Sequence, residues 1–220
     1  MKKILYQALV VAIAFTFIGC SKSSSSPQPV SVLVEGTVYP TVVIGSQTWT
    51  SLNYNGPGGE NYNNSTTNIP LFGKLYTLEE ARAIPLPKGW ELPTAADYNL
   101  LLKNAGGVPQ TRDVNGVTVI SSNYMVGSFS AVELMSTSRW QGTNGNNQLG
   151  FNAQPAGDGA ADTQNFYSLY SSAFFIVNDF TANNSHYLAV QISCSPPQAA
   201  ISDYDLGIDF RGSVRFVKNN

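Results

Sequence analysis

Short segments rich in β-branched and aromatic residues recur along the chain, separated by polar stretches that contain Gly, Pro and Asn. This pattern is typical of short strands joined by loops. It predicts strands within residues 32–44, 47–50, 174–177, 187–193 and 213–217. Residues 111–120 predict a hairpin, because Asn115-Gly116 supplies two turn residues that accept positive φ. Residues 53–68 have no apolar period and predict a long loop, which is a candidate functional segment.

Two helices are indicated by capping boxes, in which an N-cap hydroxyl and an acidic residue three positions later bond each other's backbone amides. The two pairs are Thr77 with Glu80 and Thr94 with Asp97. We expect the first helix to end before Pro85. The second should end at the glycine pair 106–107. Two early helices, many short strands and much irregular chain together predict an α+β fold.

The first 19 residues have the pattern of a signal peptide. Lys2-Lys3 forms a basic start, and residues 4–18 are almost entirely apolar. This apolar run is shorter than the roughly 20 residues that cross a bilayer core, but it has the length of a signal-peptide apolar region. The run ends at Gly19-Cys20, which resembles the bacterial lipobox. We therefore predict that residues 1–19 are removed and that Cys20 is lipidated. The alternatives are a secretory signal cut elsewhere and an uncleaved anchor.

Residues 20–31 are rich in Ser and Pro and predict a flexible tether, because such a segment cannot bury an apolar core. Residues 32–220 then form the folded domain. We expect an outer-membrane lipoprotein of the cell envelope, held to the bilayer by its acyl chains. The domain would stand on either the periplasmic or the outer face of that membrane.

The composition argues against several classes of partner and activity. Only 12% of the residues are charged and the net charge is −2, so no basic stripe is available for the phosphates of a nucleic acid. His186 is the one histidine, and lipidation of Cys20 leaves Cys194 alone, as a residue expected to be buried in a strand. No motif has metal-ligand spacing, a nucleophile elbow or a phosphate loop. We expect no catalytic residues and no cofactor other than calcium; a hydrolase whose carboxylates meet only in the fold is the third hypothesis.

Six segments resemble, in order, motifs of the Fibrobacter succinogenes major paralogous domain family. They are EGTVY and TVVIGSQTW at 35–49, LFGKLY at 71–76, PKGWELPT at 87–94, GFNAQPAG at 150–157, YSS at 170–172 and GSVRFVK at 212–218. The resemblance implies a C-type lectin-like fold and kinship with exported proteins of Bacteroidetes and related bacteria, most of which have no known activity. Leu86 and Phe216 stand where the family has two Cys, so we expect both side chains to meet in the core.

The lectin-like relatives bind calcium and sugar through a Gln-Pro-Asp or Glu-Pro-Asn loop and a later Trp-Asn-Asp motif. The resemblance therefore makes Gln154, Asn178 and Asp179 a candidate calcium site, with a purely structural turn as the alternative. Residues 203–209 place three Asp beside a Gly, loosely like a calcium loop. A solvated acidic turn is the favoured interpretation of that segment.

Aromatic residues in polar loops suit contacts with glycans or proteins, since their rings combine apolar area with polar groups nearby. The candidates are Tyr54, Tyr62, Trp140, Phe166 and Tyr167. Trp49 and Trp90 lie in framework motifs and are assigned to packing. The leading hypothesis is a non-enzymatic, lipid-anchored module that binds a glycan or a protein through its loops. A structural or adhesion component that recognises other envelope proteins is the alternative.

Overall fold

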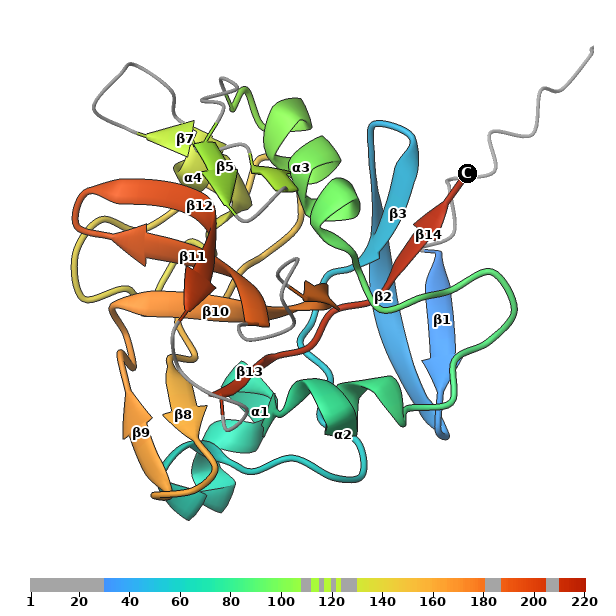
Figure 1. Cartoon of the computed structure of the whole chain (residues 1–220), viewed down its shortest axis with the longest axis vertical. Coiled ribbons are helices and arrows are strands. Elements are labelled where there is room, and N and C mark those ends of the chain that lie inside the picture. Colours follow the sequence, from blue (N-terminus) through green and yellow to red (C-terminus); the bar gives the residue numbers. More distant parts are fainter. Residues whose placement is uncertain are drawn as a thin grey trace, which may run out of the picture.

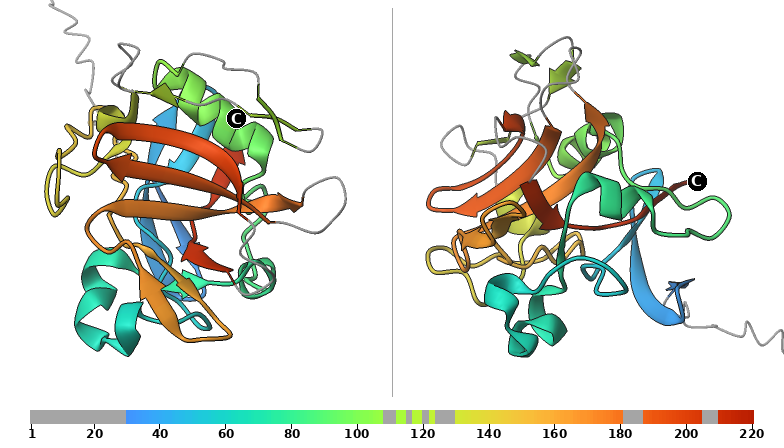
Figure 2. Two further views of the ribbon diagram at one scale, coloured as in Figure 1. Left: turned by 60° about the vertical axis from the view of Figure 1, so that its left-hand side comes forward. Right: turned by 60° about the horizontal axis from the view of Figure 1, so that its bottom comes forward.

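The computed structural model describes residues 30–107, 112–114, 117–119, 122–123, 130–180, 187–204 and 210–220. Its elements form two β-sheets with short helices around them (Figure 1, Figure 2), so the α+β class is confirmed. Several predicted features lie outside the described residues: the signal peptide, Cys20, the tether as far as residue 29, the Asn115-Gly116 turn, His186 and residues 205–209.

The smaller sheet is an antiparallel meander that is completed by the end of the chain. Strands β1 (Ser31–Val34), β2 (Thr37–Ile44) and β3 (Gln47–Thr50) follow one another through tight turns, and β14 (Val217–Asn219) pairs with β3. In that last pairing Val217 lies opposite Trp49. Strand β1 lies at the open edge of this sheet.

The larger sheet has the order β7-β12-β11-β10-β13-β8-β9, and β4 pairs with β13 beside this path. Its strands are β4 (Leu75–Tyr76), β7 (Ser122–Asn123), β8 (Asp158–Ala160), β9 (Asn165–Tyr167), β10 (Ser172–Phe180), β11 (Tyr187–Cys194), β12 (Pro197–Tyr204) and β13 (Phe210–Ser213). Strands β5 (Arg112–Val114) and β6 (Val117–Val119) form a separate antiparallel pair, as predicted.

Both predicted capping boxes are present. Thr77 caps α2 (Leu78–Arg82) and Thr94 caps α3 (Ala95–Asn104), each with its reciprocal acidic partner. The other described helices are α1 (Ile69–Phe72), α4 (Ser130–Leu134) and the 3-10 turns η1 (Tyr62–Asn64) and η2 (Thr66–Asn68). Within the described part of the chain, no helix combines the length and apolar character that a membrane span requires.

Strand β10 lies between the two apolar clusters of the core. Ala173, Phe175 and Val177 face one cluster, which includes Trp49 and residues of α3. Phe174 and Ile176, which alternate with them, face the other cluster, built around the β1–β2 hairpin and α2. A strand whose two faces are both covered has a continuous apolar sequence, and residues 173–177 have such a sequence. Leu86, which is partly buried, packs against the second cluster, and Phe216 belongs to it. Direct contact between the two side chains stays a prediction.

The predicted strand at residues 213–217 is broken in the structure. Strand β13 ends at Ser213 and β14 begins at Val217, so residues 214–216 cross from the larger sheet to the smaller one. All three crossing side chains are buried, including that of Arg215. The prediction failed because an alternating apolar pattern does not show where a chain changes from one sheet to another.

Arg215 has no exposed surface and holds this crossing in place. It donates four hydrogen bonds, to Asn53 Oδ1 at 2.6 Å, Thr50 O at 2.7 Å, Phe151 O at 2.8 Å and Asn152 O at 3.0 Å. Its guanidinium carbon also lies 4.7 Å from the ring centre of Phe151 and 5.6 Å from that of Phe175. Burial lowers the pKa of Arg215. The hydrogen bonds and the ring faces supply the polar surroundings that a buried cation needs.

Replacing Arg215 with Met is expected to lower the free energy of unfolding by about 3 kcal/mol or more, because buried oxygens on separate segments lose their donor. Urea unfolding followed by Trp fluorescence measures this change. Arg215→Lys should recover only part of the loss, since an ammonium lacks the planar fork that reaches all four oxygens. The exposed control Lys88→Met should stay within about 0.5 kcal/mol of the wild type. Equal stability of Arg215→Met and the wild type would contradict this role.

Candidate functional site

Two of the five aromatic residues predicted to contact a ligand are buried, which corrects their assignment. Tyr54 is 1% exposed and Trp140 is 5% exposed. The Tyr54 ring packs at 5.2 Å from the ring of Tyr76 and 5.3 Å from that of Phe216. The Trp140 Nε1 donates to Ser136 Oγ at 3.0 Å. Both residues lie on irregular segments, but these segments fold back over the core and turn the rings inward.

Of the other three predicted aromatic residues, Tyr62 and Phe166 are in contact beside β8 and β9, and Tyr167 follows Phe166 in β9. The Tyr62 ring centre lies 5.2 Å from that of Phe166, and the Tyr62 hydroxyl accepts a hydrogen bond from the backbone of Leu169. A Cβ atom on Gly157 would approach the Tyr62 ring to 2.9 Å, so the ring lies directly on this part of the backbone. Tyr167, next to Phe166, is 49% exposed. The 166–170 segment therefore wraps around Tyr62.

Tyr170 is a further exposed aromatic residue in this region. It belongs to the YSS motif at 170–172 and was not among the predicted binding residues. It is 43% exposed, and its ring meets Phe72 edge-on at 5.8 Å. Its backbone has a φ of 65°, a left-handed conformation that bulky side chains rarely adopt. The conformation is fixed by hydrogen bonds from its N–H to Pro155 O and from the N–H of Gln141 to its carbonyl. Strained residues of this kind concentrate at functional sites. We name Tyr62, Phe166, Tyr167 and Tyr170 the aromatic ridge.

A buried carboxyl group lies beside the aromatic ridge. Asp158 in β8 is opposite Tyr167 in β9 and is 8% exposed. Burial raises the pKa of Asp158, and a hydrogen bond from Ser168 lowers it by less. The same burial leaves one oxygen, Asp158 Oδ1, without a hydrogen-bond partner. The carboxyl group also acts on its neighbour, since its charge contributes to the raised pKa of Tyr62.

The three residues of the candidate calcium site are not brought together. Gln154 is buried and its side chain donates to Asn152 Oδ1 at 3.1 Å. Asn178 Oδ1 accepts from Arg82 at 2.8 Å, and Asp179 Oδ2 accepts from the first backbone amide of α3 at 2.6 Å. Gln154 lies near the start of β10, where Gly157 bridges to Ala173, whereas Asn178 and Asp179 lie near its end. All three side chains therefore form hydrogen bonds within the protein.

Among the described residues, no group of three or more His, Cys, Asp and Glu could hold a metal ion. The acidic turn at 205–209 and His186 lie outside those residues. Cys194 is buried at the end of β11, and its Sγ contacts Tyr170 O at 3.9 Å, so the predicted burial of this thiol is confirmed.

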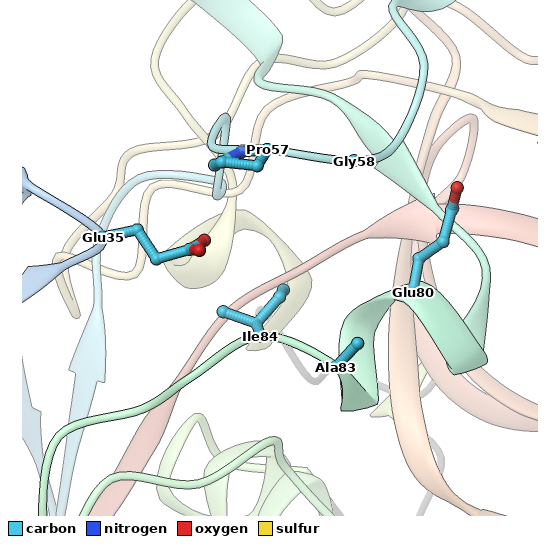
Figure 3. Close-up of a pocket in the computed structure, with 6 residues that line it drawn as sticks. All are labelled: Glu35, Pro57, Gly58, Glu80, Ala83 and Ile84. Atoms are coloured by element: carbon cyan, nitrogen blue, oxygen red, sulfur yellow. The ribbon is translucent and has the colours of Figure 1, made fainter.

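A hollow of about 240 Å³ opens between the β1–β2 turn, the loop at 57–58 and the end of α2 (Figure 3). Its lining residues are Glu35, Pro57, Gly58, Glu80, Ala83 and Ile84. Figure 3 shows the Glu35 carboxylate reaching between Pro57 and Ile84, while the Glu80 side chain stands across from it with its carboxylate turned away. We name this feature the Glu35 hollow. Sequence reasoning missed it because its walls come from three separate segments.

The two carboxylates of the Glu35 hollow have different partners. Glu80 Oε2 accepts from the Thr77 amide at 2.9 Å and pairs with Arg211, which also pairs with Glu60 at 3.4 Å. Glu35 Oε2 accepts from the Tyr54 hydroxyl. Burial and this carboxylate both raise the pKa of Tyr54, so the phenol stays protonated and donates at neutral pH. In the described part of the chain, no lysine or arginine pairs with Glu35.

An exposed apolar surface lies on the other side of the β1–β2 hairpin. Val38, Leu52 and Leu71 line a second hollow of about 90 Å³ and are all exposed, and Leu33 lies directly opposite Val38 in the strand pairing. We name these four residues the aliphatic patch. It adjoins β1, whose outer edge is not paired with any described strand.

A model of the Fibrobacter succinogenes major domain matches residues 42–218. The chain belongs to this family. The matched residues include both sheets except β1, the start of β2 and the last residue of β14, and they contain the whole aromatic ridge. Glu35 precedes them. No curated protein and no solved structure matches the chain.

Asp158→Asn is expected to stabilise the protein near neutral pH. Because the pKa of Asp158 is raised in the folded state, the folded chain binds more protons than the unfolded chain above the ordinary pKa, and stability falls as pH rises through that window. The variant should therefore have the higher Tm at about pH 7, and this advantage should fade toward about pH 4. Thermal unfolding across this range measures the effect. The exposed control Asp162→Asn should show no such pH-dependent gain; a constant difference at Asp158 would contradict the explanation.

Proposed function

We propose that this chain is a lipid-anchored binding module of the cell envelope that recognises a glycan through the aromatic ridge. The observation that carries the proposal is the pair of exposed tyrosine rings, Tyr167 and Tyr170, on a short segment whose backbone is constrained. Rigid aromatic rings give contact area at a low cost in conformational entropy. Polar side chains on the same segment, such as Asn165 and Ser168, can bond sugar hydroxyls at the edges of the rings.

The C-type lectin-like fold and the lipid anchor belong to this proposal. Two sheets, two early helices and long irregular segments are compatible with such a fold, and the apolar run that ends at Gly19-Cys20 supports export with a lipid anchor. We expect recognition that does not need calcium, because Gln154 lies apart from Asn178 and Asp179. The C-type lectin-like arrangement stays a prediction.

A non-enzymatic role is supported by the partners and directions of the two carboxylates in the Glu35 hollow. A glycosidase needs one carboxyl group as acid and another as base or nucleophile, both facing the substrate. Glu80 is held by a backbone amide and by Arg211, and its carboxylate turns away from the hollow in Figure 3. We therefore propose binding, and not hydrolysis, as the activity of this domain.

A glycan array probed with residues 21–220, with and without a chelator, tests the proposal. Tyr167→Ala and Tyr170→Ala should each weaken binding by about tenfold, which corresponds to about 1.4 kcal/mol of lost ring contact. Tyr167→Phe keeps the ring and should retain most of the binding. Chelator should have no effect. Glycan binding that survives both alanine variants would place the site elsewhere, and an empty array would favour protein recognition.

The second candidate function is assembly with envelope proteins, and one observation favours it. The aliphatic patch exposes four large apolar side chains beside the open edge of β1. An open strand edge next to apolar side chains is a suitable place for another protein to add a strand. Exposed apolar patches of this kind often mark protein contacts.

Cross-linking in intact envelopes tests this alternative. Val38→Asp places a charge in the aliphatic patch and should abolish a cross-linked product that forms through it. Val43→Asp is the matched control, because Val43 is equally exposed on the same strand but does not line the second hollow. Identical cross-linking of both variants and the wild type would exclude this patch as the contact.

A further inference from the structure

We propose that the Glu35 hollow binds a lysine side chain of a partner protein. The residues of the Glu35 hollow are not those of the aromatic ridge, so lysine binding there does not depend on glycan recognition. It rests on the charge of the hollow, on the number of carboxylate oxygens that remain for a ligand, and on the apolar character of the walls.

Glu35 supplies a negative charge that no cation in the described chain neutralises. The other charged side chains around the hollow already have partners within the protein. Arg211 bridges Glu60 and Glu80, and Lys74 donates to the carbonyl oxygens of Gly56 and Gly58 at 3.0 Å each. The hollow is therefore complementary to a positively charged group. The backbone carbonyls at 56 and 58 already attract one ammonium group to this loop.

The hydrogen bond from Tyr54 decides between the two basic side chains. Glu35 Oε2 accepts from the Tyr54 hydroxyl, so Oε1 is the oxygen of this carboxylate that is open to a ligand without competition from Tyr54. A guanidinium gains its strength from two parallel bonds to both oxygens of a carboxylate, and the Tyr54 hydroxyl competes with one of these two bonds. An ammonium is a point charge and needs only one oxygen. The hollow thus favours lysine over arginine.

The walls suit the stem of a lysine. Pro57, Ala83 and Ile84 present apolar surface, and Glu80 contributes its methylene groups because its carboxylate points elsewhere. A lysine side chain can bury its aliphatic stem on such surface while its ammonium reaches a carboxylate. A hollow of about 240 Å³ has room for a side chain of this length.

Glu35 is fixed before any ligand arrives. It occupies the first position of the β1–β2 turn with a φ of 45°, followed by Gly36 at 80°. Hairpin turns of this type usually have Asn, Asp or Gly in that position. A glutamate there accepts backbone strain, and its carboxylate is directed into the hollow by the Tyr54 hydroxyl. A preorganised acceptor loses less freedom when it binds.

An NMR titration tests the inference with a defined probe, N-acetyl-lysine methylamide. Amide signals of Gly58, Ala83 and Ile84 should shift with a dissociation constant on the order of millimolar, as expected for one partly exposed ion pair. The norleucine analogue has a similar stem without the charge and should bind at least fivefold more weakly. The arginine analogue should also bind more weakly than the lysine probe.

Two variants separate the charge from the geometry. Glu35→Gln should weaken the lysine probe at least fivefold, whereas Glu79→Gln, an equal change of charge on exposed α2 surface, should not. Tyr54→Phe frees the second oxygen of Glu35, so it should raise the affinity of the arginine analogue relative to the lysine probe. The spectra themselves show whether each variant is folded. Absence of shifts around the hollow, or equal shifts with the norleucine analogue, would overturn the proposal.

Discussion

The buried guanidinium of Arg215 is the interaction on which both sheets depend. A cation without exposed surface is costly unless its donors are satisfied, and here four oxygens and two aromatic rings surround it. The oxygens come from the end of β3, from the loop that follows it and from the 151–152 segment. One side chain thus fixes the relative positions of segments that are far apart in the sequence, at the point where the chain passes between the sheets.

The Glu35 hollow is connected to this crossing through residues on both sides of it. Strand β13 precedes it and carries Arg211, which holds Glu60 and Glu80 at one wall of the Glu35 hollow. Asn53, which accepts from Arg215, is followed directly by Tyr54, whose hydroxyl orients Glu35. The hollow is therefore attached to a fully buried part of the core, although most of its lining comes from turns and loops. The aromatic ridge is supported differently, by β8, β9 and the constrained backbone at Tyr170.

Local patterns predicted the local structure well. Both capping boxes and the α+β class were evident in the sequence, because a cap depends on residues three positions apart. Exposure could not be predicted in the same way. Tyr54 and Tyr167 both lie in polar, irregular surroundings, yet one is buried by Tyr76 and Phe216 from distant segments and the other is open to solvent. The break at Arg215 and the hollow at Glu35 likewise arise from contacts across the whole chain.

The pairing of β3 with β14 has a consequence for the order in which the protein folds. Trp49 lies opposite Val217, so β14 completes the smaller sheet, and β13, which precedes β14 in the chain, joins β10 to β8 in the larger sheet. Long-range pairing of this kind makes folding slow, because a large loop must close before its contacts form. Residues 47–49 and 217–219 must meet across the length of the domain before the smaller sheet is complete. The β1–β2–β3 meander therefore stays an incomplete sheet, with one edge of β3 open, until this distant contact has formed.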